Sequence, residues 1–287
     1  MTPIPTSRTA DAPDPMRWAE EERALICALG GYALQLSGGW LVTHERLAGS
    51  RFNFIDIGPL APARRTAFLE RALDHYFQRA LRPIVRMDPL APPGIIDSLE
   101  RLGFEEREAP LQLLVRGPGS PREMTPRHPV RPLTIEELPL LHRLWGGPKE
   151  LPEIRASLDV AVSAPARGEE VLPVAAIAGS GPVSVGLLHG WNGMWGLHAV
   201  ATLPGHRGGG WASELTIGSW GLCERAHGGR LGLRLDSARV PSRLAAAGFD
   251  SVARYRVFEL PGDHALEIPP PGPPQPPRWR PPRASAP

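Results

Sequence analysis

The sequence predicts an α/β protein of the α+β type, built from two tandem domains that share one fold. Its 287 residues suit two domains better than one. The hydrophobic share of 42% and the charged share of 22% are ordinary for a globular protein. An internal repeat is the main support for two domains: the segments Leu99–Phe104 and Leu244–Phe249 both read Leu-x-x-x-Gly-Phe.

The elements around the two copies of this repeat recur in the same order. A strand-like run followed by aspartate precedes each copy, at Pro83–Met87 and at Leu231–Leu235. A helical pattern precedes each of those runs, and an extended segment follows each Gly-Phe pair, at 111–115 and 253–260. The apolar stripes of the helical patterns are Leu69, Ala72, Leu73, Tyr76 and Ala80 in the first half, and Trp211, Leu215, Leu222, Cys223 and Ala226 in the second.

Composition divides the chain into five segments. Residues 1–15 hold too little apolar material to pack and are predicted to be a disordered tail, and residues 16–116 form the first domain. Gly, Pro and Ser cluster at 117–128, which predicts a linker, and residues 129–261 form the second domain. Residues 262–287 are a Pro-rich tail, predicted to be disordered and extended, which could dock an aromatic groove on a partner.

The second domain contains the clearest turn signal in the chain. Arg131–Leu133 reads as a first strand, and helical patterns follow at 135–145 and 153–162. Strand-like runs then cover 171–178, 183–191 and 194–203. Between the last two, Asn192-Gly193 predicts a type I′ hairpin, because both residues tolerate positive φ. If this turn has two residues, His189 and His198 lie on one sheet face as diagonal neighbours.

The segment Thr202–Ala212 predicts an anion site. A strand ends there, a glycine-rich turn follows at 208–210, and a helix begins. Free backbone N–H groups therefore converge at the positive end of a helix dipole. Glycines favour such a site because they have no Cβ to keep a phosphate oxygen away from the backbone.

The run Arg207-x-x-Gly210-x-Ala212 resembles the Arg/Gln-x-x-Gly-x-Gly/Ala motif of the GNAT superfamily of acyl-CoA N-acyltransferases. Its position after a strand and before a helix, with a strand, a helix and Gly-Phe to follow, matches the order of that superfamily. The resemblance covers about residues 129–261 well and residues 16–116 in outline. It implies two tandem GNAT-like domains, each a mixed, mostly antiparallel, splayed sheet flanked by helices.

The resemblance also implies a cofactor and the residues that bind it. Acetyl-CoA would be the co-substrate, and its acyl group would pass directly to an amine of a small molecule or protein. The strand before the motif would bind pantetheine through its backbone, and the turn and helix start would bind the pyrophosphate. The implied residues are Val200, Ala201 and Thr202 on the strand, and Arg207, Gly208, Gly209, Gly210, Trp211 and Ala212 in the motif.

The chain departs from the family at the positions that often supply acid and base. Leu244 stands where many members have a proton-donating tyrosine, and Ser237 stands where an asparagine is frequent. No glutamate lies near Met194–Trp195, where some members have the base. The catalytic candidates that remain are His198 and Asp236. The alternatives are a structural, hydrogen-bonded role for His198 and a helix-capping role for Asp236.

Three other ionisable residues are weighed in the same way. His189 is the other histidine near the presumed splay of the sheet. Cys223 lies on a helical stripe and is expected to pack in the core, and Cys27 and Cys223 have no metal-ligand spacing, so no metal site is expected.

The first half lacks the phosphate turn. At the corresponding place it reads Pro59-Leu60-Ala61-Pro62-Ala63-Arg64-Arg65, where two prolines withhold amides and no glycine admits a phosphate. We therefore expect a non-catalytic copy that packs on the second domain and walls the acceptor site. Arg64 and Arg65 could hold an anion there, and the alternative is a solvated helix start.

Charge and hydropathy narrow the function further. The net charge of +2 and the absence of long like-charge blocks argue against nucleic-acid binding. The sequence shows no signal-peptide pattern and no apolar run of membrane length, so we expect a cytoplasmic protein that does not bind membranes. The leading function is N-acyl transfer. The alternatives are an acyl-CoA-binding or sensing module without catalysis and an interaction scaffold using the tail. The acceptor, the acyl length and the oligomeric state stay open.

Overall fold

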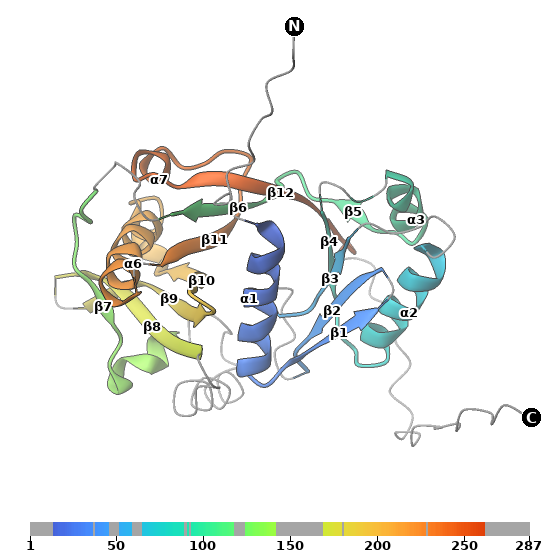
Figure 1. Cartoon of the computed structure of the whole chain (residues 1–287), viewed down its shortest axis with the longest axis horizontal. Coiled ribbons are helices and arrows are strands. Elements are labelled where there is room, and N and C mark those ends of the chain that lie inside the picture. Colours follow the sequence, from blue (N-terminus) through green and yellow to red (C-terminus); the bar gives the residue numbers. More distant parts are fainter. Residues whose placement is uncertain are drawn as a thin grey trace, which may run out of the picture.

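The structure is a computed structural model that describes residues 14–36, 38–45, 52–58, 65–88, 91, 93–117, 124–141, 169–179, 181–227 and 229–261. Residues 1–13 and 262–287 of the two predicted tails, the helical pattern at 153–162 and the turn at 59–64 lie outside the described residues. Asp14 and Pro15, the last residues of the predicted N-terminal tail, belong to the start of the first helix instead. The described strands form one twelve-stranded sheet, in the order β1-β2-β3-β4-β12-β6-β11-β10-β9-β8-β7, with β5 beside β12 (Figure 1).

The N-terminal half, up to residue 117, contributes strands to this sheet and helices beside it. Its elements are α1 (Pro15–Ala28), β1 (Tyr32–Leu36), β2 (Gly39–Thr43), β3 (Phe54–Ile57), α2 (Arg65–Phe77), β4 (Ile84–Met87), the 3-10 turn η2 (Pro93–Ile95), α3 (Ile96–Arg101), β5 (Glu105–Glu106) and β6 (Leu111–Arg116). Helix α1 begins at an N-cap, because the Asp14 carboxylate accepts the N–H of Met16 at 2.9 Å and Pro15 has no N–H to satisfy.

The C-terminal half, from residue 124, repeats the arrangement with longer strands. Its elements are β7 (Val130–Pro132), η3 (Ile135–Glu137), β8 (Glu169–Ala178), β9 (Gly181–Trp191), β10 (Met194–Thr202), η4 (Pro204–His206), α6 (Trp211–His227), β11 (Arg230–Asp236), α7 (Ser242–Ala246) and β12 (Asp250–Glu259). The predicted hairpin is confirmed: Trp191 pairs with Met194, and Asn192 and Gly193 have φ of 49° and 76°.

The internal repeat is also a repeat in three dimensions, which confirms the tandem fold. Gly103 and Gly248 have nearly equal φ values of 83° and 82°, and the phenylalanine after each is buried. The N–H of each phenylalanine donates to the carbonyl of the leucine that opens the repeat, at 3.0 Å in both copies. Each half also contains a strand–helix–strand unit with parallel strands, β3-α2-β4 and β10-α6-β11.

The two halves exchange their last strands. Strand β6 of the N-terminal half pairs with β11 and β12 of the C-terminal half, and β12 continues to β4 and β5. In Figure 1, β12 accordingly extends from above β6 across to β4. The predicted linker at 117–128 divides the sequence, but the sheet runs through both halves without a break. The predicted domain boundaries therefore stay a prediction, because one sheet is common to both halves.

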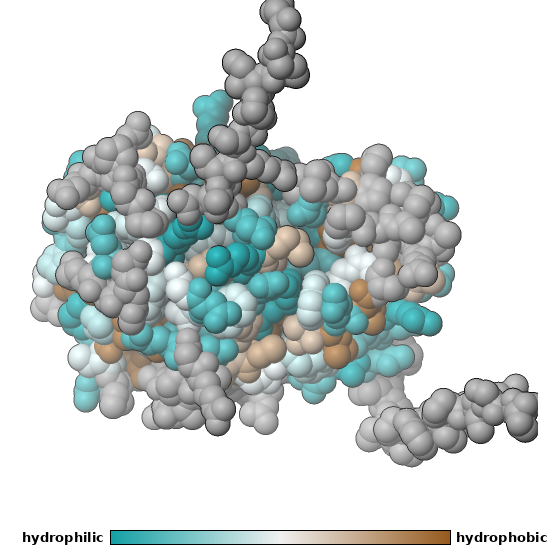
Figure 2. Space-filling view, viewed as in Figure 1, coloured by the Kyte–Doolittle hydropathy of each residue, from teal (hydrophilic) through white to brown (hydrophobic). Residues whose placement is uncertain are grey.

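Helix α1 packs on the sheet of the other half. It contacts β9 and β10 as well as β1 and β2, and it lies in front of the centre of the sheet in Figure 1. Its inner face buries Trp18, Glu21, Leu25 and Ile26. The surface over α1 is largely hydrophilic in Figure 2. Helix α6 covers the opposite face, where its residues pack with Leu197 of β10.

No helix among the described residues is long and apolar enough to cross a membrane. Within the same residues, no group of three or more His, Cys, Asp or Glu side chains is arranged to hold a metal ion.

Candidate active site

The parallel strands β10 and β11 separate part of the way along their length. They pair at four positions, from Met194 with Arg230 to Leu197 with Leu233. The β10–β9 register then shifts between His198 and Ala201, and Ala199 in this bulge has a φ of 50°. Because a bulge bends its strand, β10 continues to its end along β9 only. A gap therefore opens between the second parts of β10 and β11.

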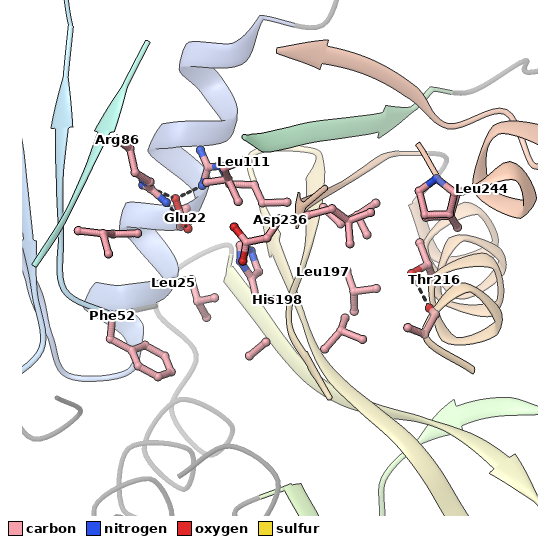
Figure 3. Close-up of a pocket in the computed structure, with 18 of the residues that line it drawn as sticks. Glu22, Leu25, Phe52, Arg86, Leu111, Leu197, His198, Thr216, Asp236 and Leu244 are labelled. Atoms are coloured by element: carbon pink, nitrogen blue, oxygen red, sulfur yellow. Dashed lines mark hydrogen bonds and ion pairs between the residues drawn. The ribbon is translucent and has the colours of Figure 1, made fainter. Parts of the chain in front are cut away.

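A cavity of about 530 Å³ runs through this gap. At one end it is lined by Ala212 and Thr216 of α6 and by Leu244 of α7, and at the other by Glu22 of α1 and Arg86 of β4. In Figure 3, His198 and Asp236 lie between these two groups of residues. The N-terminal half thus forms one wall of the cavity; that this wall belongs to the acceptor site stays a prediction.

The predicted strand residues have different positions relative to this cavity. Val200 lines it together with His198 and Ala199. Ala201 and Thr202 are paired with Val185 and Ser184 of β9, and the Ser184 hydroxyl donates to the Ala201 carbonyl at 3.2 Å. Of the three, Val200 alone lines the cavity, and the backbone role of all three stays a prediction.

The glycine turn at the start of α6 has two glycines with a left-handed backbone. Gly208 and Gly210 both have a φ of 79°, which glycine adopts readily and other residues do not. A Cβ at either position would meet no protein atom within 4 Å. The N–H groups of Gly208 and Gly210 have no hydrogen-bond acceptor among the described residues, whereas that of Gly209 donates to the His206 carbonyl at 3.4 Å. The exposed Arg207 side chain donates from Nε to the Thr202 carbonyl at 3.3 Å.

The first turn of α6 is bordered by aromatic rings and one buried acid. Trp211 stacks on His128 with ring centroids 4.1 Å apart and meets His206 edge-on at 5.8 Å. The Glu214 carboxylate accepts the N–H of Arg127 at 2.6 Å and forms an ion pair with Arg243 of α7. This carboxylate is therefore engaged with the protein.

His189 and His198 are diagonal neighbours, as predicted, and one carboxylate joins them. Glu21 of α1 is 1% exposed. Its Oε1 lies 2.7 Å from His189 Nδ1 and 2.8 Å from His198 Nε2. Burial alone would raise the pKa of Glu21, but the charges and hydrogen bonds of the two histidines outweigh it and lower this pKa to about 2. Only His198 of the two histidines lines the cavity.

A second acid of α1 connects the halves through arginines. Glu22 accepts hydrogen bonds from Arg86 Nη1 and Nη2 at 3.0 and 2.8 Å, and it also pairs with Arg234 of β11. Arg86 donates further to Asp56 at 2.7 Å. Sequence reasoning missed both Glu21 and Glu22. The available signal was two adjacent glutamates at helical spacing from Trp18 and Leu25, on the face of α1 that has to be buried.

The structure also shows the contacts of four other residues that were considered from the sequence. Asp236 ends β11 with a side chain that is 60% exposed, and its carboxylate lies 3.6 Å from Arg107. Leu244 is buried and lines the cavity. The Ser237 hydroxyl donates to the Arg239 carbonyl at 2.7 Å. Cys223 packs in the core, as expected, and burial raises the pKa of its thiol to about 12.

Comparison with solved structures identifies the fold. A GCN5-related N-acetyltransferase from Kribbella flavida is 18% identical, with 87% of this chain and 97% of that chain covered and a TM-score of 0.61. A GCN5-related N-acetyltransferase from Sphaerobacter thermophilus is 15% identical, with 86% and 93% covered and a TM-score of 0.54. A tandem GNAT protein from the clavulanic acid biosynthesis pathway is 13% identical, with 72% and 74% covered and a TM-score of 0.50.

No protein-family model matches the sequence, and a search of curated proteins found no match. The identification therefore rests on the three-dimensional likeness, together with the separated parallel strands and the glycine turn. The chain has the fold of the GNAT N-acetyltransferases, in its tandem form.

Proposed function

We propose that this protein is an N-acyltransferase that moves an acetyl group from acetyl-CoA directly to an amine. The observation that supports it most is the cavity, which begins at Ala212 in the first turn of α6, passes the gap between β10 and β11, and reaches His198. A cofactor bound at the turn could extend along this path and present its thioester near a titratable side chain.

The chain offers suitable groups for each part of the cofactor. The N–H groups of the turn and the first turn of α6 would bind the pyrophosphate, with Arg207 adding a positive charge. The edge of β10 at Ala199 and Val200 faces the gap without a ladder partner on β11 among the described residues, which suits the amides of pantetheine. Acetyl-CoA supplies the activated acyl group.

The transfer itself needs a base at the amine. His198 would take a proton from the acceptor nitrogen as that nitrogen bonds to the thioester carbonyl carbon. The C–S bond then breaks and CoA leaves as a thiolate. Leu244 offers no proton, so the thiolate would be protonated by solvent, at little cost because a free thiol has a pKa of about 8.5.

Asp236 is the second residue that we assign to the reaction. Its exposed carboxylate lines the cavity, where it would attract and orient a protonated acceptor. Since the N-terminal half walls the far side of the cavity, the acceptor is a small molecule or the end of a peptide chain. We place the reaction in the reducing cytoplasm, in keeping with the free thiols of Cys27 and Cys223.

One observation favours a second function, acyl-CoA binding without catalysis. The side chain at the family's proton-donor position, Leu244, is apolar and buried against the cavity. A sensor or storage module would have no use for a donor there.

The experiment is a titration with acetyl-CoA by calorimetry, followed by thiol release with a panel of amines and mass detection of the acetylated product. Binding together with amine-dependent thiol release is the expected result. Binding without release for every amine would favour the sensor, and the absence of binding would exclude both functions.

A further inference from the structure

We propose that Glu21, which comes from the N-terminal half, is the positioning residue of the base in the C-terminal half. It holds His198 in the tautomer that leaves Nδ1 able to accept a proton from the acceptor amine. The proposal rests on the proposed function for its kinetic consequences, but its geometry can be tested without activity.

The contacts around Glu21 separate the roles of the two histidines. Its Oε1 bonds both rings, and its Oε2 makes a further contact of 3.1 Å with His198 Nε2. The His189 side chain is fully buried, whereas that of His198 is 18% exposed. A substrate in the cavity can therefore reach His198, while His189 can act only as a second donor to the carboxylate.

The charge state of Glu21 determines which nitrogen of His198 is free. With a pKa of about 2, this carboxyl is ionised at neutral pH. An ionised carboxylate only accepts hydrogen bonds, so Nε2 of His198 must carry the proton that it donates. In the neutral ring the lone pair is then on Nδ1, which has no hydrogen-bond partner among the described residues. That arrangement is the one a general base needs.

The sheet is shaped to admit this carboxylate. Gly196 and Gly232 lie opposite each other in the β10–β11 ladder. A Cβ at Gly196 would collide with the Glu21 carboxylate and with His198 Nε2, and a Cβ at Gly232 would lie 2.6 Å from Cζ3 of Trp18. Trp18 and Glu21 are one turn apart on α1. Because these two glycines have no side chains, they leave a recess in the sheet. The turn of α1 from Trp18 to Glu21 fits into this recess and brings the carboxylate to His198.

A positioning role predicts a specific pattern of kinetic change. Glu21→Gln keeps the size of the side chain and removes its charge, so the His198 ring is free to adopt either tautomer and its protonated form loses a stabilising partner. We expect kcat to fall on the order of a hundredfold. The acidic limb of kcat/KM should move to lower pH, because protonation of the base becomes less favourable. Acetyl-CoA affinity should stay within about twofold of wild type.

The control is Glu20→Gln, the same change at the adjacent exposed position of α1, which should leave kcat and the pH profile as in wild type. Glu21→Asp keeps the charge and should restore part of kcat and the position of the acidic limb. A Glu21→Gln enzyme that is slower but has the wild-type acidic limb would overturn the proposal, since a merely structural loss produces that result.

A second measurement needs neither a variant of Glu21 nor a substrate. Nitrogen-15 NMR of the histidines in the full chain reports the tautomer of each ring, with the His198 signals assigned by their loss in His198→Gln. In the neutral His198 ring, protonated Nε2 and unprotonated Nδ1 support the proposal, and the opposite tautomer overturns it. If no amine is acetylated but the tautomer is as stated, the proposed function fails while the geometry of the dyad holds.

Discussion

The two strand–helix–strand units of this molecule share one topology and differ in whether their parallel strands part. In the C-terminal half, β10 and β11 pair at four positions and then part. In the N-terminal half, β3 and β4 pair at every one of their positions, from Phe54 with Ile84 to Ile57 with Met87. The ladder even continues, because the Asp88 N–H donates to the Ile57 carbonyl at 3.2 Å. No gap opens between β3 and β4 in the described part of that half.

The surroundings of each pair explain this difference. Ala199 adopts positive φ and the bulge turns β10 away from β11. In the N-terminal half, the buried hydroxyl of Tyr76 on α2 lies 2.7 Å from the carbonyls of Val42 and Phe54, and α2 closes over the ladder. In the described residues, the N-terminal half thus keeps its parallel ladder closed and contributes α1 to the sheet of the other half.

The largest effect expected from this comparison concerns the number of acetyl-CoA molecules that one chain binds. Titration of the full chain with acetyl-CoA should give a stoichiometry near one, because in the part of the chain that the structure describes only β10 and β11 open. The measurement is isothermal calorimetry on protein of known active concentration. A ratio near two would mean that the closed ladder of β3 and β4 does not prevent binding, and the comparison would fail.

The next largest effect concerns α1, which joins the halves. The pKa of Glu21 in the folded chain is about 2, below its ordinary value of 4.5, so the stabilisation it provides is present above pH 4.5 and is lost as the pH falls toward 2. It is worth on the order of 3 kcal/mol. Urea unfolding of wild type and Glu21→Gln should therefore show a stability difference that shrinks from pH 6 to pH 3. A difference that is constant or grows with acid would contradict this result.

A smaller effect tests the turn before α6. Gly210→Val should weaken acetyl-CoA binding at least tenfold, or about 1.4 kcal/mol, because its branched carbons would occupy space that phosphate oxygens need. Gly103→Val is the matched control in the N-terminal half, since Gly103 also has positive φ and open space for a Cβ. Calorimetry on both folded variants should show a loss of acetyl-CoA affinity in Gly210→Val only. Equal loss in both would point to a general effect of backbone strain.

The smallest effect belongs to Asp236, whose side chain is mostly exposed. Asp236→Asn should raise KM for the amine by less than about fivefold and leave kcat unchanged, because exposed charges contribute about 0–1 kcal/mol. Asp88→Asn makes the same change at the corresponding place after β4, and it should leave both constants as they are. Steady-state kinetics with varied amine checks both. A loss of kcat of a hundredfold in Asp236→Asn would instead make this carboxylate the base.

The sequence predicted the features that depend on residues adjacent in the chain. The Asn192-Gly193 hairpin was predictable because the two residues tolerate positive φ and are adjacent. The glycine turn before α6 and the two Gly-Phe repeats were predictable for the same reason, since each is a short segment whose residue types restrict its backbone. The diagonal placement of His189 and His198 then followed from the length of one turn.

The tertiary structure alone decided which distant segments meet. The exchange of β6 and β12 could not be predicted, because an extended apolar strand fits several sheet edges equally well and its own residues do not specify the edge. The pairing of Glu21 with His198 spans 177 residues, and nothing in either local pattern refers to the other. It exists because α1 buries its apolar face on a recess made by two glycines, and a carboxylate carried into that recess must find hydrogen-bond donors there.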